Sequence, residues 1–264
     1  MKEDSMQDCC PICGGKSIVL IDQTAKKYRC QSCDNTFTFS VTPPAPKTVP
    51  KPMAATKPET TALTAKQVYK KTVSGTVEVG ATFGDNDSRG TGFCVSSNGF
   101  FLTNAHVVIG KKNNKLALCD GVSVSDSRSN DFTEAEVVFL DADNDLALLK
   151  IKGKRSCRPL TFALRDPETG DRVYAIGNSR GEGLSLLDGI VGDANRPFRS
   201  TKAFLFNALV THGCSGGPVF NDRAEICGIT VGGVENSAGM NYAIPVSTIK
   251  SFILKAKTEK GLSI

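Results

Sequence analysis

A glycine-rich stretch, THGCSGGPVF (residues 211–220), places one serine where chemistry is possible. Three glycines and a proline surround Ser215, a composition typical of a tight loop. A serine hydroxyl attacks an acyl carbon only when a base takes its proton and hydrogen-bond donors stabilise the resulting oxyanion. Ser215 is therefore a candidate nucleophile, provided that the chain also supplies a base and a group that orients the base.

The chain contains 2 histidines, so few residues can be the base. His212 lies three residues before Ser215 in the same loop, where an in-line approach to the hydroxyl is hindered. His106 follows the apolar run FFLTNA, which is typical of a strand that carries the histidine to its end. Taken alone, a histidine in an apolar run is more often a packed residue than a catalytic one.

An aspartate is available to orient the histidine. Asp145 directly precedes the apolar strand pattern LALLKI, so its carboxylate is expected at a strand edge. Alone, it could equally cap a turn, and Asp141 and Asp143 in the same segment fit that simpler role better. Together, however, Ser215, His106 and Asp145 supply the nucleophile, base and orienting carboxylate of a catalytic triad.

The elements that must position these residues are mostly strands. From residue 74 onward, short apolar or alternating segments recur every 8–12 residues or so with turn residues between them, which predicts an all-β barrel or sandwich. Asn98-Gly99 favours a tight hairpin turn between two of them. Only VSTIKSFILKAKTEK (residues 246–260) has helical spacing of its apolar residues, with lysines toward its end.

Three segments resemble the catalytic blocks of trypsin-like serine peptidases, closest to the HtrA/Deg branch: TNAHVV, DNDLALLKI and GCSGGPVF. The order His, Asp, Ser is also that of this family. The resemblance covers about residues 72–255. It implies two six-stranded Greek-key β-barrels of the chymotrypsin-like fold, at about residues 72–158 and 159–250, followed by a C-terminal helix at about 246–258.

The resemblance also implies the roles of the site residues. Ser215 attacks the peptide carbonyl, His106 takes its proton, and Asp145 fixes the imidazole tautomer. The loop Gly213, Cys214 and Ser215 forms the oxyanion hole, with the N–H groups of Gly213 and Ser215 as donors. Cys214 departs from the branch, which usually has asparagine there. A cysteine nucleophile is the alternative, disfavoured because the glycine pair follows Ser215.

For substrate specificity, the family places the floor of the primary pocket six residues before the nucleophile, at Leu209. The wall and the substrate backbone contacts are then formed by Thr230, Val231, Gly232 and Gly233. An apolar floor without Asp or Glu predicts cleavage after small-to-medium aliphatic residues rather than after Lys or Arg.

A second candidate site lies near the N-terminus. Cys10 and Cys13 form one Cys-x-x-Cys pair, and Cys30 and Cys33 form another, which together supply four thiolates for a tetrahedral metal ion. The cluster resembles a zinc ribbon, with short strands between the pairs and a third from NTFTF (residues 35–39). Zinc is the expected ion. Iron in a rubredoxin-like site and a pair of disulfides are the alternatives.

The remaining cysteines bear on the cellular compartment. Apart from these four and Cys9, the chain has five cysteines, which cannot all pair with one another, so we expect reduced thiols. The polar start MKEDSMQDCC predicts no secretory signal, and no apolar run has the roughly 18–20 residues of a membrane helix. A cytoplasmic location without membrane contact follows. No PDZ domain is expected after the peptidase domain.

Between the two sites lies a segment that cannot pack a core. VTPPAPKTVPKPMAATKPETTALTA (residues 41–65) contains six prolines and no aromatic residue. Residues 41–71 carry six lysines and one glutamate, which accounts for the whole formal net charge of +5. We expect a zinc ribbon at 1–40, a disordered linker at 41–71 and a trypsin-like peptidase domain at 72–264.

The sequence thus predicts a serine endopeptidase that acts on protein or peptide substrates. The ribbon is expected to bind a partner protein or nucleic acid, and the oligomeric state is left open. Two alternatives remain at this point: a catalytically silent binding module on a peptidase scaffold, and a peptidase gated or targeted by its zinc ribbon.

Overall fold

The computed structural model describes residues 16–25, 27–38, 62–112, 115–126, 131–153, 157–199, 201–233 and 239–264. The chain divides into two compact units, Met1–Pro58 and Glu59–Ile264. Cys10, Cys13 and most of the predicted linker lie outside the described residues.

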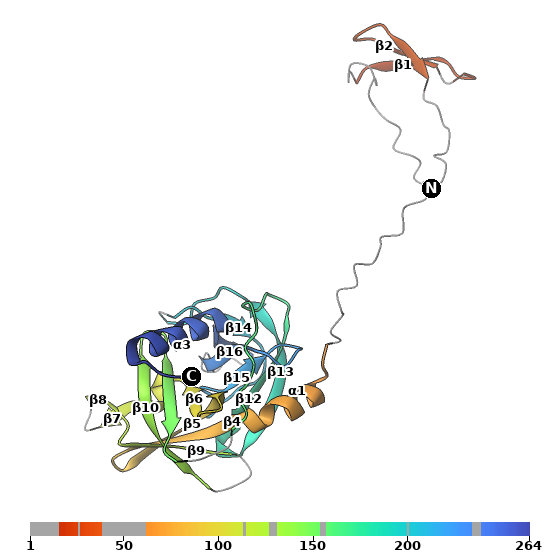
Figure 1. Ribbon diagram of the computed structural model, residues 1–264. Coiled ribbons are helices and arrows are strands. Elements are labelled where there is room, and N and C mark those ends of the chain that lie inside the picture. The colour runs from red at the N-terminus through yellow and green to blue at the C-terminus, as the bar shows by residue number, and fades with distance from the viewer. Residues whose placement is uncertain are drawn as a thin grey trace. The chain divides into compact units, whose positions relative to one another are not determined.

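The first unit contains a small antiparallel sheet. Its strands are β1 (Ile18–Asp22), β2 (Lys27–Cys30) and β3 (Thr36–Thr38), in that order across the sheet (Figure 1). Tyr28 stacks on Phe37 with ring centroids 6.1 Å apart. Among the described residues of this unit, only Tyr28 and Cys30 are buried, so the apolar core of this described part is very small.

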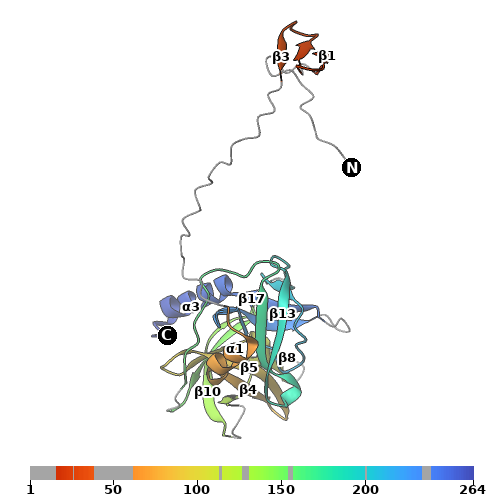
Figure 2. The same cartoon turned by 90° about the vertical axis from the view of Figure 1, so that its right-hand side faces the viewer.

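The second unit begins with helix α1 (Ala65–Thr72), continued by the short 3₁₀ turn η1 (Val73–Gly75). Thr64 and Gln67 form a capping box at its N-terminus, and Val68 is fully buried. The predicted linker was therefore drawn too long at its C-terminal end, since residues 65–71 belong to this packed unit. Helix α1 lies beside the second barrel's strands β12 (Arg172–Asn178) and β13 (Leu184–Asp193) (Figures 1 and 2).

Six strands close the first barrel in the order β10-β11-β6-β5-β4-β9. They are β4 (Thr76–Phe83), β5 (Asn86–Ser96), β6 (Phe100–Thr103), β9 (Gly121–Ser125), β10 (Thr133–Asp141) and β11 (Leu146–Ile151). Strands β5 and β6 form the hairpin that Asn98-Gly99 predicts, with Gly99 at φ +82°. Between β6 and β9 come helix α2 (Ala105–Val108) and the hairpin of β7 (Ile109–Lys112) and β8 (Lys115–Leu118).

Six more strands close the second barrel in the order β12-β13-β14-β17-β16-β15. Beyond β12 and β13, they are β14 (Phe204–Phe206), β15 (Pro218–Phe220), β16 (Ile226–Gly233) and β17 (Asn241–Pro245). A short 3₁₀ turn, η2 (Ser179–Gly181), follows β12, and helix α3 (Val246–Lys260) follows β17. The predicted fold of two six-stranded barrels and a C-terminal helix is confirmed.

The two barrels share a continuous apolar core. Phe93, Leu102 and Leu148 of the first barrel belong to the same buried cluster as Ile176 and Ile229 of the second. Each barrel also has its own interior cluster, so β6 and β11 are buried on both faces and read as nearly continuous apolar runs. This packing holds the loops of one barrel in a fixed position against those of the other.

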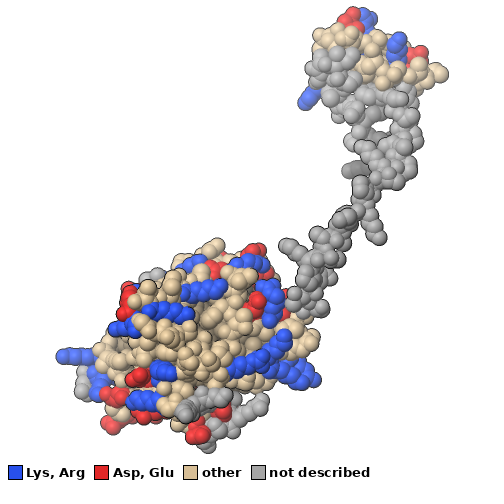
Figure 3. Space-filling model, in the orientation of Figure 1, with Lys and Arg blue, Asp and Glu red and all other residues tan. Residues whose placement is uncertain are grey.

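Helix α3 bridges the barrels from outside. It contacts β16 and β17 of the second barrel and β10 of the first, where Phe252 packs on Phe139 with ring centroids 5.3 Å apart. None of the helices in the described ranges has the length and apolar character that crossing a bilayer requires. The face of the second unit seen in Figure 3 carries Lys and Arg side chains interspersed with Asp and Glu.

Candidate active site

His106 stands at the end of β6, on the one-turn helix α2. Its neighbours Ala105, Val107 and Val108 are buried and anchor the turn, while the imidazole is 39% exposed. Asn104, fully buried, donates from Nδ2 to the carbonyl oxygen of Asp145 at 2.9 Å. The turn is thereby tied to the strand end that carries the aspartate.

Asp145 contacts His106 with both carboxylate oxygens. Oδ2 lies 2.7 Å from His106 Nδ1, and Oδ1 accepts the His106 backbone N–H at 2.9 Å. The backbone of Asp145 is left-handed, with φ +52°, which aims the side chain back at the histidine. A carboxylate at Nδ1 favours the tautomer with its proton on that nitrogen, which leaves Nε2 free to accept a proton.

Asp141 and Asp143 do not take part in this pair. Asp141 accepts hydrogen bonds from the backbone and side chain of Asn144, both at 3.0 Å, so it stabilises the turn as expected. Asp143 contributes its carbonyl oxygen, which accepts from Thr201 Oγ1 at 2.8 Å.

The Ser215 loop is held against the segment that carries His106 by contacts between the barrels. The Thr91 N–H on β5 donates to the Ser215 carbonyl oxygen at 2.8 Å. Gly90 separates the two catalytic segments, because a Cβ there would lie 2.7 Å from Val107 and 3.1 Å from the Ser215 oxygen. The next residue, Gly216, at φ +81°, fits against Thr103 and the Asn104 backbone, where a larger residue would clash. The three predicted triad residues thus come from segments that pack directly on one another.

The N–H groups predicted to form the oxyanion hole have no competing acceptor in the part of the chain that the structure describes. Within the described ranges, neither the Gly213 N–H nor the Ser215 N–H donates a hydrogen bond. Gly213 has φ +94°, and a Cβ there would clash with the Asn178 carbonyl oxygen, so glycine is required. The carbonyl oxygen of His212 accepts the Arg180 N–H at 2.8 Å and so does not occupy the hole.

Cys214 points away from the substrate side. Its side chain is 1% exposed and packs under Gly177 on β12, with Sγ 3.3 Å from Ser179 Oγ. A buried sulfur cannot reach a peptide carbonyl, which rules against the cysteine-nucleophile alternative. His212, the second histidine, is exposed in the loop, and no hydrogen bond joins it to His106, Asp145 or Ser215 among the described residues.

The predicted substrate-binding residues fall into two groups. Thr230 is bonded to the nucleophile loop, since its carbonyl oxygen accepts the Gly216 N–H at 2.9 Å and its N–H donates to Gly217 at 2.8 Å. Val231 is buried, whereas Gly232 and Gly233 continue β16 toward solvent. Leu209 is 62% exposed and does not form a pocket floor in this structure, which corrects that prediction. The count of six residues gives its place in the chain but not the path of the loop.

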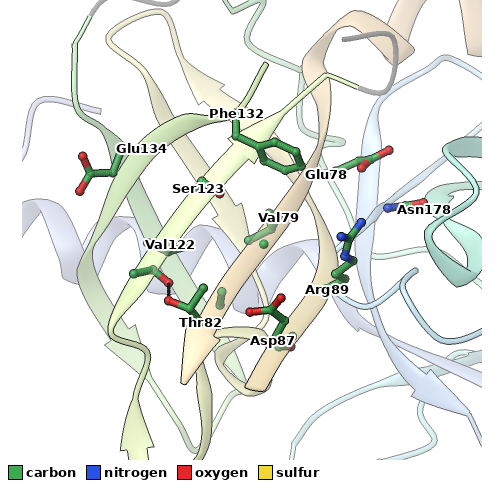
Figure 4. A pocket seen from close by; sticks show the side chains of 14 residues that line it. Glu78, Val79, Thr82, Asp87, Arg89, Val122, Ser123, Phe132, Glu134 and Asn178 are labelled. Atoms are coloured by element: carbon green, nitrogen blue, oxygen red, sulfur yellow. Dashed lines mark hydrogen bonds between the residues drawn. The ribbon is translucent and has the colours of Figure 1, made fainter. Parts of the chain in front are cut away.

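The first barrel carries a separate cavity of about 320 Å³ on its outer face, over β4, β5 and β9 (Figure 4). Glu78, Arg89 and Phe132 project into it, and Asn178 lies at the side of the second barrel. None of its described lining residues is a predicted catalytic or substrate-binding residue.

Two cysteines of the second unit are joined in a disulfide and are not thiols. Cys94 on β5 and Cys157 in the connection between the barrels are joined as a disulfide, with Cα atoms 6.3 Å apart. This corrects the expectation of five reduced thiols, because an odd number forbids complete pairing but permits one pair. Cys119, Cys214 and Cys227 are thiols. Burial raises the pKa of the Cys227 thiol, which keeps it protonated and unreactive. The cytoplasmic location stays a prediction.

In the first unit, the structure describes one of the two predicted cysteine pairs. Cys30 is fully buried at the end of β2, and Cys33 is half-buried in the turn that follows. The Ser32 N–H points at Cys30 Sγ at 3.4 Å, and Asn35 Nδ2 at Cys33 Sγ at 3.5 Å. Two sulfurs in one turn, each approached by a hydrogen-bond donor, are compatible with metal ligation by this turn.

Comparison with known proteins agrees with the fold and with the geometry of the candidate site. The family described as a trypsin-like peptidase domain matches residues 90–229, more than half of the chain. The chain is 32% identical over 182 residues to serine protease HTRA1 of Xenopus tropicalis, which covers 66% of this chain and 37% of the relative. It is 31% identical over 195 residues to the chloroplastic Protease Do-like 5 of Arabidopsis thaliana, and this match covers 68% of this chain and 60% of the relative. The chain therefore spans less than two thirds of these relatives.

Solved structures show the same fold. The HtrA-type protease AlgW with a tripeptide superposes with a TM-score of 0.65 at 24% identity, over 75% of this chain and 64% of that one. A serine endoprotease from Yersinia pestis superposes with a TM-score of 0.63 at 25% identity, over 76% of this chain and 69% of that chain. With the two barrels, the family match and the packed His, Asp and Ser segments, the chain belongs to the trypsin-like peptidase domain family.

Proposed function

We propose that this protein is a serine endopeptidase that hydrolyses peptide bonds through an acyl-enzyme. The observation that carries the proposal is the two-point contact of Asp145 with His106, made beside the Ser215 loop. A carboxylate that only capped a turn would not need to meet both the ring and the backbone of one histidine.

The residues take the following roles. Ser215 Oγ attacks the scissile carbonyl carbon while His106 Nε2 accepts its proton, and the negative charge moves to the carbonyl oxygen. Asp145 stabilises the imidazolium that forms. The proton then passes from His106 to the leaving amine, and water repeats the sequence to release the acyl group.

The oxyanion is stabilised by the N–H groups of Gly213 and Ser215. Both groups lack a protein acceptor among the described residues, so they are available when the negative charge develops. Removing such a donor typically costs about 10²–10³-fold in rate.

The substrate backbone would lie along β16 at Thr230, Val231 and Gly232, next to the nucleophile loop. Residues 204–214 contain no Asp or Glu, which supports the preference for small-to-medium aliphatic residues even though Leu209 is exposed. Profiling with a peptide library tests this preference, and dominant cleavage after Lys or Arg would contradict it.

A fluorophosphonate probe tests the activity. We expect it to label the wild-type protein and Cys214→Ala, but not Ser215→Ala. Failure to label the wild-type protein, together with no hydrolysis of a peptide library, would favour the silent binding module. Labelling lost in Cys214→Ala but kept in Ser215→Ala would contradict the assignment of the nucleophile.

We further propose that the first unit is a zinc ribbon with Cys10, Cys13, Cys30 and Cys33 as ligands. The donors that face Cys30 and Cys33 support this assignment, and so does the very small apolar core. Zinc would cross-link the turns and take no part in peptide hydrolysis. Metal analysis of the purified protein distinguishes zinc from iron, and a thiol assay distinguishes both from disulfides.

The ribbon is proposed to bring the peptidase to a partner protein or nucleic acid. Activity measured with and without a chelator separates a targeting role from gating, because gating requires a changed rate on a small peptide. Salt-dependent binding of single- and double-stranded nucleic acid by the full chain tests the second kind of partner.

A further inference from the structure

Thr91 occupies an unusual position between the two barrels. It lies on β5 between Gly90 and Gly92 and is fully buried. Apart from the strand ladder, its polar groups bond mainly to the second barrel. The hydroxyl donates to the Gly213 carbonyl oxygen at 2.7 Å and accepts the Asn178 N–H at 2.9 Å. Its backbone N–H donates to Ser215.

These bonds fix the direction of the hydroxyl proton. Because the Asn178 N–H donates to Oγ1, the single hydroxyl hydrogen is left for the Gly213 carbonyl oxygen. The chain of bonds therefore runs from the end of β12, through a first-barrel side chain, to the loop of the nucleophile. The carbonyl oxygen of Thr91 is in turn bound by Thr103 Oγ1 at 2.7 Å, which holds the residue in place.

Gly213 is the residue of this loop that most needs such support. Its φ of +94° is open to glycine alone, and glycine rotates more freely than any other residue. The peptide before it carries the N–H proposed for the oxyanion hole and is held by Arg180 through His212. The peptide after it is held by Thr91. With both neighbouring peptides bonded, the direction of the Gly213 N–H is set before substrate arrives.

We propose that Thr91 is a positioning residue for the oxyanion hole. Through the Thr91 hydroxyl, the first barrel orients the Gly213 N–H. This inference rests on the proposed peptidase function. Thr91 does not touch substrate. It acts through Gly213, while its methyl group packs near Gly217, where a Cβ would lie 3.3 Å from Thr91 Cγ2.

Three variants separate the effect of the Thr91 hydroxyl from the effect of the packing of its methyl group. Thr91→Val keeps the shape and removes the hydroxyl, whereas Thr91→Ser keeps the hydroxyl and removes the methyl. Thr72→Val is the matched control, because Thr72 is equally buried and its hydroxyl also donates to a backbone carbonyl, that of Val68 at 2.8 Å, within α1. The readouts are kcat and KM on a peptide substrate, and the inhibition constants of a peptide boronate and of the same peptide without the boronate.

We expect Thr91→Val to lose about 10–100-fold in kcat with KM little changed, since misplaced donors weaken only the transition state. Its affinity for the boronate, which places an oxygen in the oxyanion hole, should fall by a similar factor. Its affinity for the plain peptide should not fall. Thr91→Ser should stay within about threefold of wild type, and Thr72→Val should match wild type.

Equal kcat and boronate affinity in Thr91→Val and wild type would overturn the proposal. So would an equal loss in Thr91→Ser, which would assign the effect to the methyl group. If valine prevents folding, Thr91→Ala removes the same hydroxyl and is held to the same boronate comparison. An inactive wild-type protein would refute the peptidase function itself, whereas an active wild type with an unaffected Thr91→Val would refute the positioning role alone.

Discussion

The two units of this chain hold their shape in different ways. The second unit has three buried apolar clusters, one inside each barrel and one between them. The described part of the first unit has two buried residues, Tyr28 and Cys30. Burial of apolar surface can account for the stability of the barrels, but a sheet of three short strands needs another source. The comparison supports the proposal that metal ligation by cysteines stabilises the first unit, whereas packed phenylalanine and leucine side chains stabilise the second.

Removal of the proposed metal should give the largest effect, and the absence of an effect would contradict the comparison between the two units. In the full chain, Cys30→Ser or a strong chelator should unfold β1–β3 while the barrels stay intact, because structural zinc supplies about 10–16 kcal/mol to such units. Hydrogen exchange of residues 18–38 against residues 76–245 measures both outcomes. Cys119→Ser, a change at a half-buried thiol of the second unit, is the control. Protection of β1–β3 that survives chelation would show that the small core suffices.

Asp145→Asn tests whether chemistry in the second unit can be separated from its stability. We expect kcat to fall by about 10⁴-fold, because an amide favours the wrong histidine tautomer. The melting temperature should change little, since asparagine tolerates the left-handed backbone at φ +52°. Asp141→Asn, in the same turn, should keep its activity. A small loss of kcat in Asp145→Asn would mean that this carboxylate does not orient the base.

A pair of substitutions of apolar residues by alanine, one in each unit, compares the units directly. Phe101 on β6 is fully buried in the first barrel, and Phe101→Ala should cost about 3–5 kcal/mol of unfolding free energy. Val19 on β1 is 43% exposed, and Val19→Ala should cost less than about 0.5 kcal/mol. Urea unfolding followed separately for each unit measures both. Equal costs would show that the first unit also depends on apolar burial.

The smallest effect concerns a carboxylate at the start of α3. Burial raises the pKa of Asp166, but hydrogen bonds from Lys202 and Ser247 outweigh burial and lower it below its ordinary value. A lowered folded-state pKa stabilises the protein above the unfolded-state value of about 3.9, and the stabilisation is lost as pH falls through the folded-state pKa.

Asp166→Asn should therefore lower the melting temperature slightly at pH 7. The difference from wild type should shrink as the pH falls through the lowered folded-state pKa of Asp166. Thermal melts of both proteins across this range provide the measurement. A difference that persists unchanged at low pH would show that the effect of the substitution is one of packing rather than charge.

The sequence predicts much of this molecule because its decisive signals are local. The blocks around His106, Asp145 and Ser215 each combine a chemical group with a strand end or a glycine turn, and the structure packs the three together. Helix 246–258 was predicted almost to its observed end. The capping pair Thr64 and Gln67 was also a local signal, and it could have placed the start of the second unit correctly.

The features that the sequence does not predict depend on residues that are far apart in the chain and meet only in the folded structure. Thr91 bonds to residues 87 and 122 positions away, and a threonine between two glycines of a strand gives no sign of this. The pairing of Cys94 with Cys157 spans 63 residues. Leu209 was placed by counting back from Ser215, but the path of a loop follows from its contacts rather than from its length.

The open sheet of the first unit has one further consequence, which concerns solubility. Both barrels close on themselves and leave no free strand edge, whereas β1 borders a sheet of the order β1-β2-β3 in the described part of the chain. Its residues Val19, Leu20 and Ile21 are 43–49% exposed. Unpaired edges of this composition promote association between chains. Precipitation of concentrated samples should therefore begin at these three residues, and a lysine in place of Leu20 should delay it.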